Sequence, residues 1–463
     1  MNELGLMTTC ELLGALDRRD VSSAELLDVY LDRIAALDPA LNAVVTLDEE
    51  RAREAARAAD ATRIAGGPLG RLHGLPMTVK DAIETAGIRS TGGAVELADH
   101  VPVADAPAVG RLRHAGAIVF GKTNLPRWSG DLQTYNELFG PTQNPWDLDR
   151  TPGGSSGGAA VAVACGLTAC ELGTDIGGSV RVPSAWCGVF GHKPSFGVVA
   201  QRGYLDHVGG GVTDADINVF GPIARSADDL DLLLSVLAGP APELEAAWSI
   251  QLPPARSSTL AGARVGLWLD DTDCPVDRAT GDVLSRLGDL LSAAGARVSE
   301  DRPSIGLRQS FEVYLPLVSS AASVSLGEPE ASERAGNHRR WLELDERRAG
   351  LRAAWASYFE SHDALLCPVL PTAAVPHDRD TPLFERTVLV NGRPVPLFET
   401  ILWTGLVGVA YLPSTVVPAG FTDGGLPVGV QVVGPFLGDR TTIALAREIG
   451  RLTGGYQVPP LAR

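Results

Sequence analysis

Residues 151–183 read TPGGSSGGAAVAVACGLTACELGTDIGGSVRVP, and this stretch decides how the rest of the chain is interpreted. Two of its serines are flanked by glycines, Ser155 in GGSSGG and Ser179 in DIGGSVR. Glycine adopts backbone conformations that other residues avoid, so both serines are expected in tight loops where the main chain approaches a ligand closely. Serines placed in this way are candidate nucleophiles.

The glycines before Ser179 predict an anion-binding loop. Consecutive backbone N–H groups can converge on one point, and such a group beside a nucleophile forms an oxyanion hole. The expected donors are Ile176, Gly177 and Gly178. The alternative is a plain glycine-rich turn in which Ser179 only bonds to the backbone, as serine often does.

The few lysines of the chain favour a catalytic interpretation. Of the 39 basic residues only Lys80, Lys122 and Lys193 are lysine, and all three lie in the motif-bearing region. A buried lysine can lose its proton, whereas arginine effectively cannot, so a site that needs a neutral amine must keep lysine. Apolar residues lead into Lys80 in GLPMTVKDAI, which makes Lys80 the candidate base. Lys122 and Lys193 are expected to form structural hydrogen bonds.

Several further motifs occur in a characteristic order along the chain. They are GLPMTVKD, GKTNLP, NELFGPTQNPWD, GGSSGG, DIGGSVR, GHKPS and GPIARSADDL. In this order they resemble the amidase signature family of serine hydrolases. The resemblance covers residues 65–235, and LPVGVQVVGP at 426–435 is similar to the family's C-terminal strand region.

The resemblance implies a mechanism. Ser179 would be the nucleophile, Ser155 would relay the proton, and neutral Lys80 would be the base. The peptide bond before Ser155 would be cis, as in the family. Asp175 and Arg181 would support the loop as an ion pair, and Ser156 would bond within the same network.

The resemblance also implies an α/β fold, with a large central mixed β-sheet covered by helices on both faces. The chain is expected to form one domain over residues 1–463. In chain order, its expected parts are an N-terminal helical arm (1–62), a signature core (65–235), a variable substrate-side region (240–400) and the C-terminal part of the sheet (405–463).

Local sequence patterns predict several helices and strands. Thr8 and Glu11, Ser22 and Glu25, and Thr46 and Glu49 each have the capping-box spacing. They indicate helices near 9–19, 23–37 and 47–61. The apolar runs in MTVKDAI and in AIVFG at 117–121 predict buried strands, and AAVAVACG predicts a helix that ends near Gly166. The charged segment 327–350 is expected to be helical.

Two motifs suggest other enzyme classes. Gly153, Ser155 and Gly157 match the GxSxG elbow of α/β-hydrolases, but that elbow needs a strand directly before it, and NPWDLDRTP reads as a loop. Residues 116–123, GAIVFGKT, match the phosphate-loop pattern of nucleotide-binding proteins. Their middle residues are apolar and read as a buried strand, so an NTPase is disfavoured.

Composition disfavours several kinds of binding surface and site. The net charge of −17 and pI of about 4.9 disfavour a nucleic-acid surface. The six cysteines lack metal-ligand spacing, and neither a signal peptide nor an apolar run long enough for a membrane span is evident. We therefore expect a reduced, cytoplasmic monomer or homodimer without a metal or cofactor.

The substrate is less well defined. The stretch GDLQTYNELFGPTQNPWD resembles bacterial amidases that act on aryl amides, oligoamides and carbamates, so apolar amides are expected, with carbamates and esters as further candidates. Segments 311–318 and 399–409 are candidates either for an apolar pocket or for the core. Candidate substrate-binding residues are Gln133, Thr134, Tyr135 and Gly154. The alternative within the family is an amidotransferase component that needs ATP and a partner, which the acidic charge balance disfavours.

Overall fold

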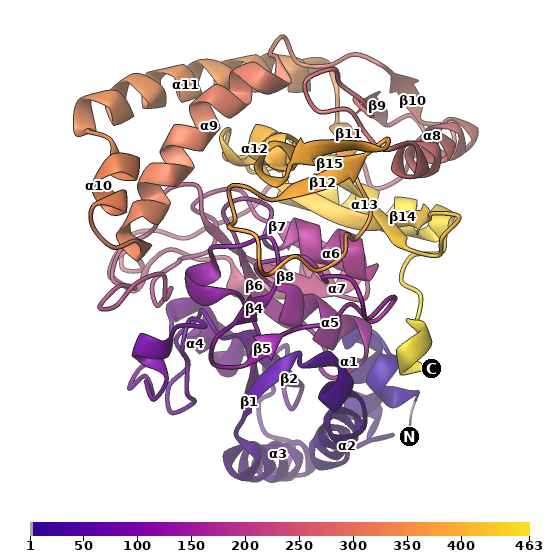
Figure 1. Ribbon diagram of the computed structural model, residues 1–463. Coiled ribbons are helices and arrows are strands. Elements are labelled where there is room, and N and C mark those ends of the chain that lie inside the picture. Colours follow the sequence, from indigo (N-terminus) through magenta and orange to yellow (C-terminus); the bar gives the residue numbers. More distant parts are fainter. Residues whose placement is uncertain (1–2) are drawn as a thin grey trace.

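The large predicted sheet is present. The computed structural model describes residues 3–463, and within them the largest sheet has eight strands in the order β10-β9-β11-β15-β14-β7-β8-β6 (Figure 1). Its strands are β6 (Glu171–Asp175), β7 (Phe190–Lys193), β8 (Val219–Ala224), β9 (Arg264–Leu267), β10 (Arg297–Ser299), β11 (Ala364–Pro368), β14 (Ser414–Phe421) and β15 (Pro427–Val433). β9 runs parallel to β10 and β11, and the other pairs are antiparallel, so the predicted mixed sheet is confirmed.

Helices cover both faces of this sheet. Adjacent strand residues point to opposite faces. In β14, Val417 belongs to the same apolar cluster as Ile443, whereas Val416 clusters with Ala185. The helices that carry these partners lie on opposite sides: α13 (Asp439–Thr453) packs with α7 (Ala227–Leu237) and α8 (Arg278–Ala293), and α6 (Arg181–Cys187) packs with α5 (Gly157–Ala164).

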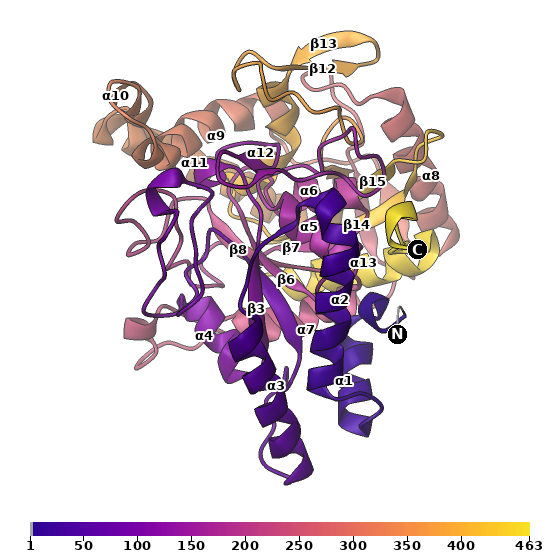
Figure 2. The same ribbon diagram turned by 60° about the horizontal axis from the view of Figure 1, so that its bottom comes forward.

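The N-terminal helices begin as their caps predict, with one exception. α1 (Thr9–Arg18) and α2 (Ser23–Leu41) start at complete capping boxes. The third predicted box is wrong, because Thr46 lies in β1 (Val44–Leu47), where it pairs with Lys122. Strand pairing keeps these residues extended, and α3 (Glu49–Ile64) starts after Asp48 instead. The three helices gather near the N-terminus (Figure 2).

Lys80 comes from a second, smaller sheet with the strand order β1-β3-β2. The predicted strands are confirmed as β2 (Pro76–Lys80) and β3 (Ile118–Thr123). The phosphate-loop interpretation of 116–123 is therefore wrong, because its middle residues belong to a buried strand. The Lys122 ammonium donates to Thr85 Oγ1 at 2.8 Å and to the Ile83 carbonyl, as expected for a structural lysine.

The remaining elements surround these two sheets. The helices are α4 (Pro107–His114), α9 (Leu307–Ala322), α10 (Glu330–Ala335), α11 (His338–Ser361) and α12 (Leu402–Gly408). The short strand pairs are β4 (Tyr135–Asn136) with β5 (Gly140–Pro141), and β12 (Thr387–Val390) with β13 (Arg393–Pro396). Single 3₁₀ turns lie at Leu4–Leu6, Val95–Leu97, Arg127–Ser129, Pro242–Leu244, Ser323–Ser325, Leu397–Ile401 and Pro460–Ala462.

Helices α10 and α11 confirm the helical prediction for 327–350. Within residues 3–463, none of the helices combines the length and the apolarity that a membrane span requires.

Candidate active site

Lys80 ends β2 with its side chain fully buried. Its Nζ donates to Ser155 Oγ at 2.7 Å and to Thr174 Oγ1 at 2.8 Å. Burial lowers the pKa of Lys80 to about 7, although the carboxylates of Asp175 and Glu171 oppose this shift. A substantial fraction of this amine is therefore neutral near pH 7 and can accept a proton.

Ser155 lies in the loop before α5, and the Gly154–Ser155 peptide bond is cis, as the resemblance implies. A Cβ atom on Gly154 would lie 2.6 Å from the carbonyl oxygen of Asp131, so only glycine fits at this position. The GxSxG-elbow interpretation is wrong. Among the described residues, the strand before this loop is β5, which ends at Pro141, far from Ser155.

Ser179 lies in the loop between β6 and α6 and is 6% exposed. Ile176, Gly177 and Ser179 line one cavity. The backbone N–H of Gly178 instead donates to Asp175 Oδ1 at 2.9 Å, so this amide is already occupied. The N–H of Ser156 donates to the carbonyl of Ser179 at 3.1 Å, which ties the two serine loops together.

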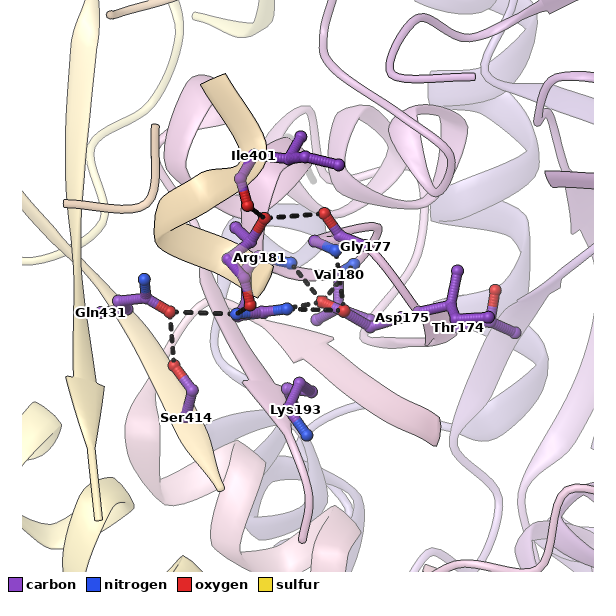
Figure 3. A network of polar contacts seen from close by, with 12 residues as sticks. Thr174, Asp175, Gly177, Val180, Arg181, Lys193, Ile401, Ser414 and Gln431 are labelled. Carbon is purple, nitrogen blue, oxygen red and sulfur yellow. Dashed lines mark hydrogen bonds and ion pairs between the residues drawn. The ribbon is translucent and has the colours of Figure 1, made fainter. Parts of the chain in front are cut away.

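A buried ion pair supports the Ser179 loop. Arg181 donates from Nε and Nη2 to the two carboxylate oxygens of Asp175 at 3.0 and 2.9 Å, and both side chains are fully buried. Arg181 Nη1 also donates to Gln431 Oε1 at 3.1 Å. Figure 3 shows Arg181 between Asp175 and Gln431. The Asp175 carboxylate accepts from the amides of Gly178 and Val180 as well, so the pair fixes the loop on both sides of Ser179.

Two residues of the same region have structural contacts. Ser156 Oγ donates to the carbonyl of Thr174 at 3.3 Å, next to the Lys80 contact. Lys193 is labelled beside the ion pair in Figure 3, and its ammonium donates to the Pro194 carbonyl at 2.9 Å, as expected for a structural lysine.

The cavity at Ser179 has a volume of about 210 Å³ and mostly apolar walls. Tyr314 and Val318 come from segment 311–318, and Ile401 comes from segment 399–409. Most other apolar residues of the two segments belong to a buried core cluster, so the segments contribute both to the pocket and to the core. Further wall residues were not singled out from the sequence, although the last five lie in the predicted substrate-side region 240–400: Trp128–Leu132, Tyr204, Asp206, Leu326, Arg334, Leu383, Phe384 and Phe398.

The candidate substrate-binding residues lie elsewhere. Gln133, Thr134 and Tyr135 are not among the residues that line the Ser179 cavity. Thr134 Oγ1 donates to the Gly153 carbonyl at 2.8 Å and accepts from the Gly157 amide at 3.1 Å, so it bridges the two sides of the Ser155 loop. Gln133 and Tyr135 bond to Asp378 and Arg386. Gly154 packs its backbone against the 131–133 segment.

A family model described as Amidase matches residues 25–330 and 317–443. The chain belongs to the amidase family. Among the solved structures similar to it is a bacterial aryl acylamidase of the amidase signature enzymes, with a TM-score of 0.87 and 26% identity, covering 99% of this chain and 98% of that one.

The chain is also similar to proteins named as amidotransferase subunits. A glutamyl-tRNA(Gln) amidotransferase subunit from Moorella thermoacetica is 33% identical over 499 residues, covering 99% of both chains. The structure of the protein of that name from Thermotoga maritima has a TM-score of 0.81 and 26% identity, covering 99% of this chain and 98% of that one.

Proposed function

We propose that this amidase-family chain hydrolyses carboxylic amide C–N bonds through an acyl-enzyme on Ser179. The observation that carries the proposal is the 2.7 Å hydrogen bond between Lys80 Nζ and Ser155 Oγ, buried beside the loop that presents Ser179 to a cavity. A nucleophile, a relay and a base with a lowered pKa are what amide cleavage by serine requires.

In the proposed first step, Ser179 Oγ attacks the amide carbonyl and its proton passes to Ser155, whose own proton passes to neutral Lys80. Protonated Lys80 then returns a proton through Ser155 to the departing nitrogen, and the amine leaves. Water then attacks the acyl ester and passes its proton through Ser155 to Lys80. As the acid leaves, that proton returns through Ser155 to Ser179 Oγ, which restores neutral Lys80.

The negative charge that develops on the carbonyl oxygen needs donors. We assign the amides of Ile176 and Gly177 to this task, together with the amide of Ser179. The Gly178 amide is excluded from our proposal because it donates to Asp175. Tyr314 donates to the Ile176 carbonyl at 3.1 Å, which fixes the peptide unit that carries the Gly177 amide. Thr404 donates to the Gly177 carbonyl at 2.8 Å, which fixes the next peptide unit of the same loop. Preorganised donors of this kind are worth roughly 2.7–4 kcal/mol each in the transition state.

The cavity favours apolar or aryl amides. Its walls include Tyr314, Val318, Phe398 and Ile401, and these come from the part of the chain that we assign to the substrate side, 240–400, and its immediate continuation. Carbamates and esters present the same attack geometry, so they are further candidate substrates. One methylene in such a pocket changes selectivity by only about 1–3 kcal/mol, which favours a broad substrate range.

The second candidate is an amidotransferase component that requires ATP and a partner protein. It is favoured by the 33% identity over 99% of both chains with the amidotransferase protein from Moorella thermoacetica. The apolar walls of the Ser179 cavity favour the independent amidase, because a glutamine side-chain amide is small and polar.

One experiment separates the two candidates. The purified chain, alone and without ATP, is incubated with a panel of aryl amides, aliphatic amides, carbamates, esters and glutamine, and the released amine is measured. Ser179→Ala protein is the control for contaminating hydrolases. We expect release from aryl amides by the wild-type chain. Turnover of glutamine alone, or turnover only with ATP and a partner protein, would assign the chain to the amidotransferase class.

A further inference from the structure

One loop forms part of the Ser179 cavity without belonging to any catalytic motif. We call residues 377–386, the last part of the connection between β11 and β12, the strap. Leu383 and Phe384 of the strap line the cavity at Ser179. Phe384 is 51% exposed, so its position depends on a few specific contacts rather than on burial in the core.

The side chains of Arg386 and Gln133 fasten the strap to residues 131–135, of which Asp131 and Leu132 line the cavity at Ser179. Arg386 Nη1 donates to Asp131 Oδ2 at 2.7 Å, and Arg386 Nη2 donates to the hydroxyl of Tyr135 at 2.7 Å. Gln133 Nε2 donates to the carbonyl of Asp378 at 2.7 Å, and Gln133 Oε1 accepts from the Asp378 amide at 3.0 Å. The side chains of Arg386 and Asp131 are only 4% and 9% exposed, so water screens this ion pair weakly.

A second cavity of about 630 Å³ lies behind the strap. Gln133, Asp378 and Arg386 line this cavity, whereas Asp131 and Phe384 line the one at Ser179. The strap and its fastening residues therefore form the partition between two cavities. Because there is open space on both sides, the polar contacts carry more of its positioning than they would in a packed core.

The strap presents an aromatic surface to the Ser179 cavity. The rings of Phe384 and Phe398 stack with their centroids 4.7 Å apart and their planes at 30°. The guanidinium of Arg334 lies 3.9 Å from the centroid of Phe384, and Arg334 is itself paired with Glu330 at 3.0 Å. These contacts hold the Phe384 ring in one orientation, as aromatic and cation–π pairs do.

We propose that Phe384 is a specificity-determining residue that selects substrates with a planar aryl group, and that Gln133 acts through it as a positioning residue by fastening the strap. This inference rests on the proposed amide hydrolysis. The proposal gives a role to Gln133, which the sequence suggested as a substrate-binding residue but which is not among the residues that line the cavity at Ser179.

The test compares three amides: benzamide, with an aryl group on the acyl side; acetanilide, with an aryl group on the amine side; and butyramide, with none. Phe384→Ala should raise KM for at least one aryl substrate by about twofold to tenfold, the range expected for one lost aromatic pair, and should leave kcat and the KM of butyramide nearly unchanged. Phe436→Ala is the matched control, because Phe436 is also partly exposed beneath an arginine, with Arg352 4.8 Å from its ring centroid. Equal changes for all three amides, no change, or the same change in Phe436→Ala would overturn the assignment.

A double-mutant cycle tests the role of Gln133. Gln133→Leu should raise KM for the same aryl substrate, and combining it with Phe384→Ala should add little, because both changes remove the same surface. Additive effects would show that Gln133 does not act through the strap. Binding of benzamide and acetanilide, measured by calorimetry in Ser179→Ala protein, supplies a readout without turnover. Loss of aryl binding in Phe384→Ala together with no hydrolysis by the wild type would retain the strap assignment and reject the proposed function.

Discussion

Lys80 Nζ lies 2.7 Å from Ser155 Oγ, and both side chains are fully buried. A buried ammonium without a formal counter-ion in contact is unstable, and this desolvation lowers the pKa of Lys80 to about 7. The same geometry therefore provides both a path for a proton and a base that can accept it at neutral pH.

Lys80→Met should lower kcat/KM by roughly two to four orders of magnitude, the usual contribution of a general base. Lys80→Arg should not restore activity, because a guanidinium cannot be deprotonated in proteins. Steady-state kinetics on one aryl amide measures both effects, and near-UV circular dichroism checks that each variant keeps the native packing. Activity of Lys80→Arg within tenfold of the wild type would exclude Lys80 as the base.

The pH profile should follow the charge on Lys80. Because the base must be neutral, kcat/KM should fall below pH 7 as Lys80 is protonated and level off above it. Thr174→Val removes a hydroxyl that accepts a hydrogen bond from the Lys80 ammonium and so favours charged Lys80. In this variant the fall of kcat/KM on the acid side of the profile (the acid limb) should therefore occur at lower pH. Thr174→Ser, which keeps a hydroxyl, is the matched control. An acid limb that stays in place in Thr174→Val would assign it to another group, such as Glu171, whose pKa burial raises to about 7.

A fluorophosphonate reagent should label Ser179. This serine lines the cavity, whereas Ser155 is fully buried behind it. Peptide mass spectrometry locates the adduct, and Ser179→Ala should abolish both labelling and amide cleavage. Labelling should persist, at a reduced rate, in Ser155→Ala. An adduct on Ser155 in the wild type would reverse the assignment of nucleophile and relay.

The sequence pointed to the proposed catalytic residues more directly than to the pocket. Ser155, Ser179 and Lys80 each lie in a short motif whose composition is dictated locally: glycines where the backbone must turn, and lysine where arginine would stay charged. The contact between Lys80 and Ser155, by contrast, joins a small sheet to a distant loop, and only the family resemblance pointed to it.

Apart from Tyr314, Val318 and Ile401, the pocket walls could not be found in this way, because they come from segments without a local signature. Phe384 and Arg334 are far apart in the chain and lie in contact only in the fold. Gln133 was predicted to bind substrate because it lies in the stretch GDLQTYNELFGPTQNPWD, which resembles bacterial amidases, yet its side chain bonds to Asp378. The capping-box prediction at Thr46 was wrong for a related reason, since pairing of Thr46 with β3 overrides a pattern that is only local.

Arg181→Met should destabilise the protein by roughly 3–5 kcal/mol, because it leaves the buried Asp175 carboxylate without its charge partner. Burial alone would raise the pKa of Asp175, but Arg181, with help from Lys193 and the Gly178 amide, holds the pKa below its usual value. Urea denaturation measures the change. Arg339→Met is the control, because the exposed Arg339–Glu343 pair on α11 should contribute little. Similar unfolding midpoints for the two variants would show that the ion pair is not a main support of the Ser179 loop.

Thr134 provides a test of how strictly the Ser155 loop must be held. Its hydroxyl bridges the carbonyl of Gly153 and the amide of Gly157, one on each side of the cis peptide. Thr134→Val keeps the shape and removes the bridge, leaving two buried backbone groups unpaired at a cost of about 1–3 kcal/mol each.

The catalytic effect should appear in kcat rather than in KM, because Thr134 lies outside the cavity and acts on the position of Ser155. A small displacement of a reacting group can cost about 100-fold in rate, so we expect a loss up to that size. Thr134→Ser retains the hydroxyl and should recover most of the rate. If Thr134→Val instead raised KM and left kcat unchanged, Thr134 would bind substrate directly, as its place in the sequence first suggested.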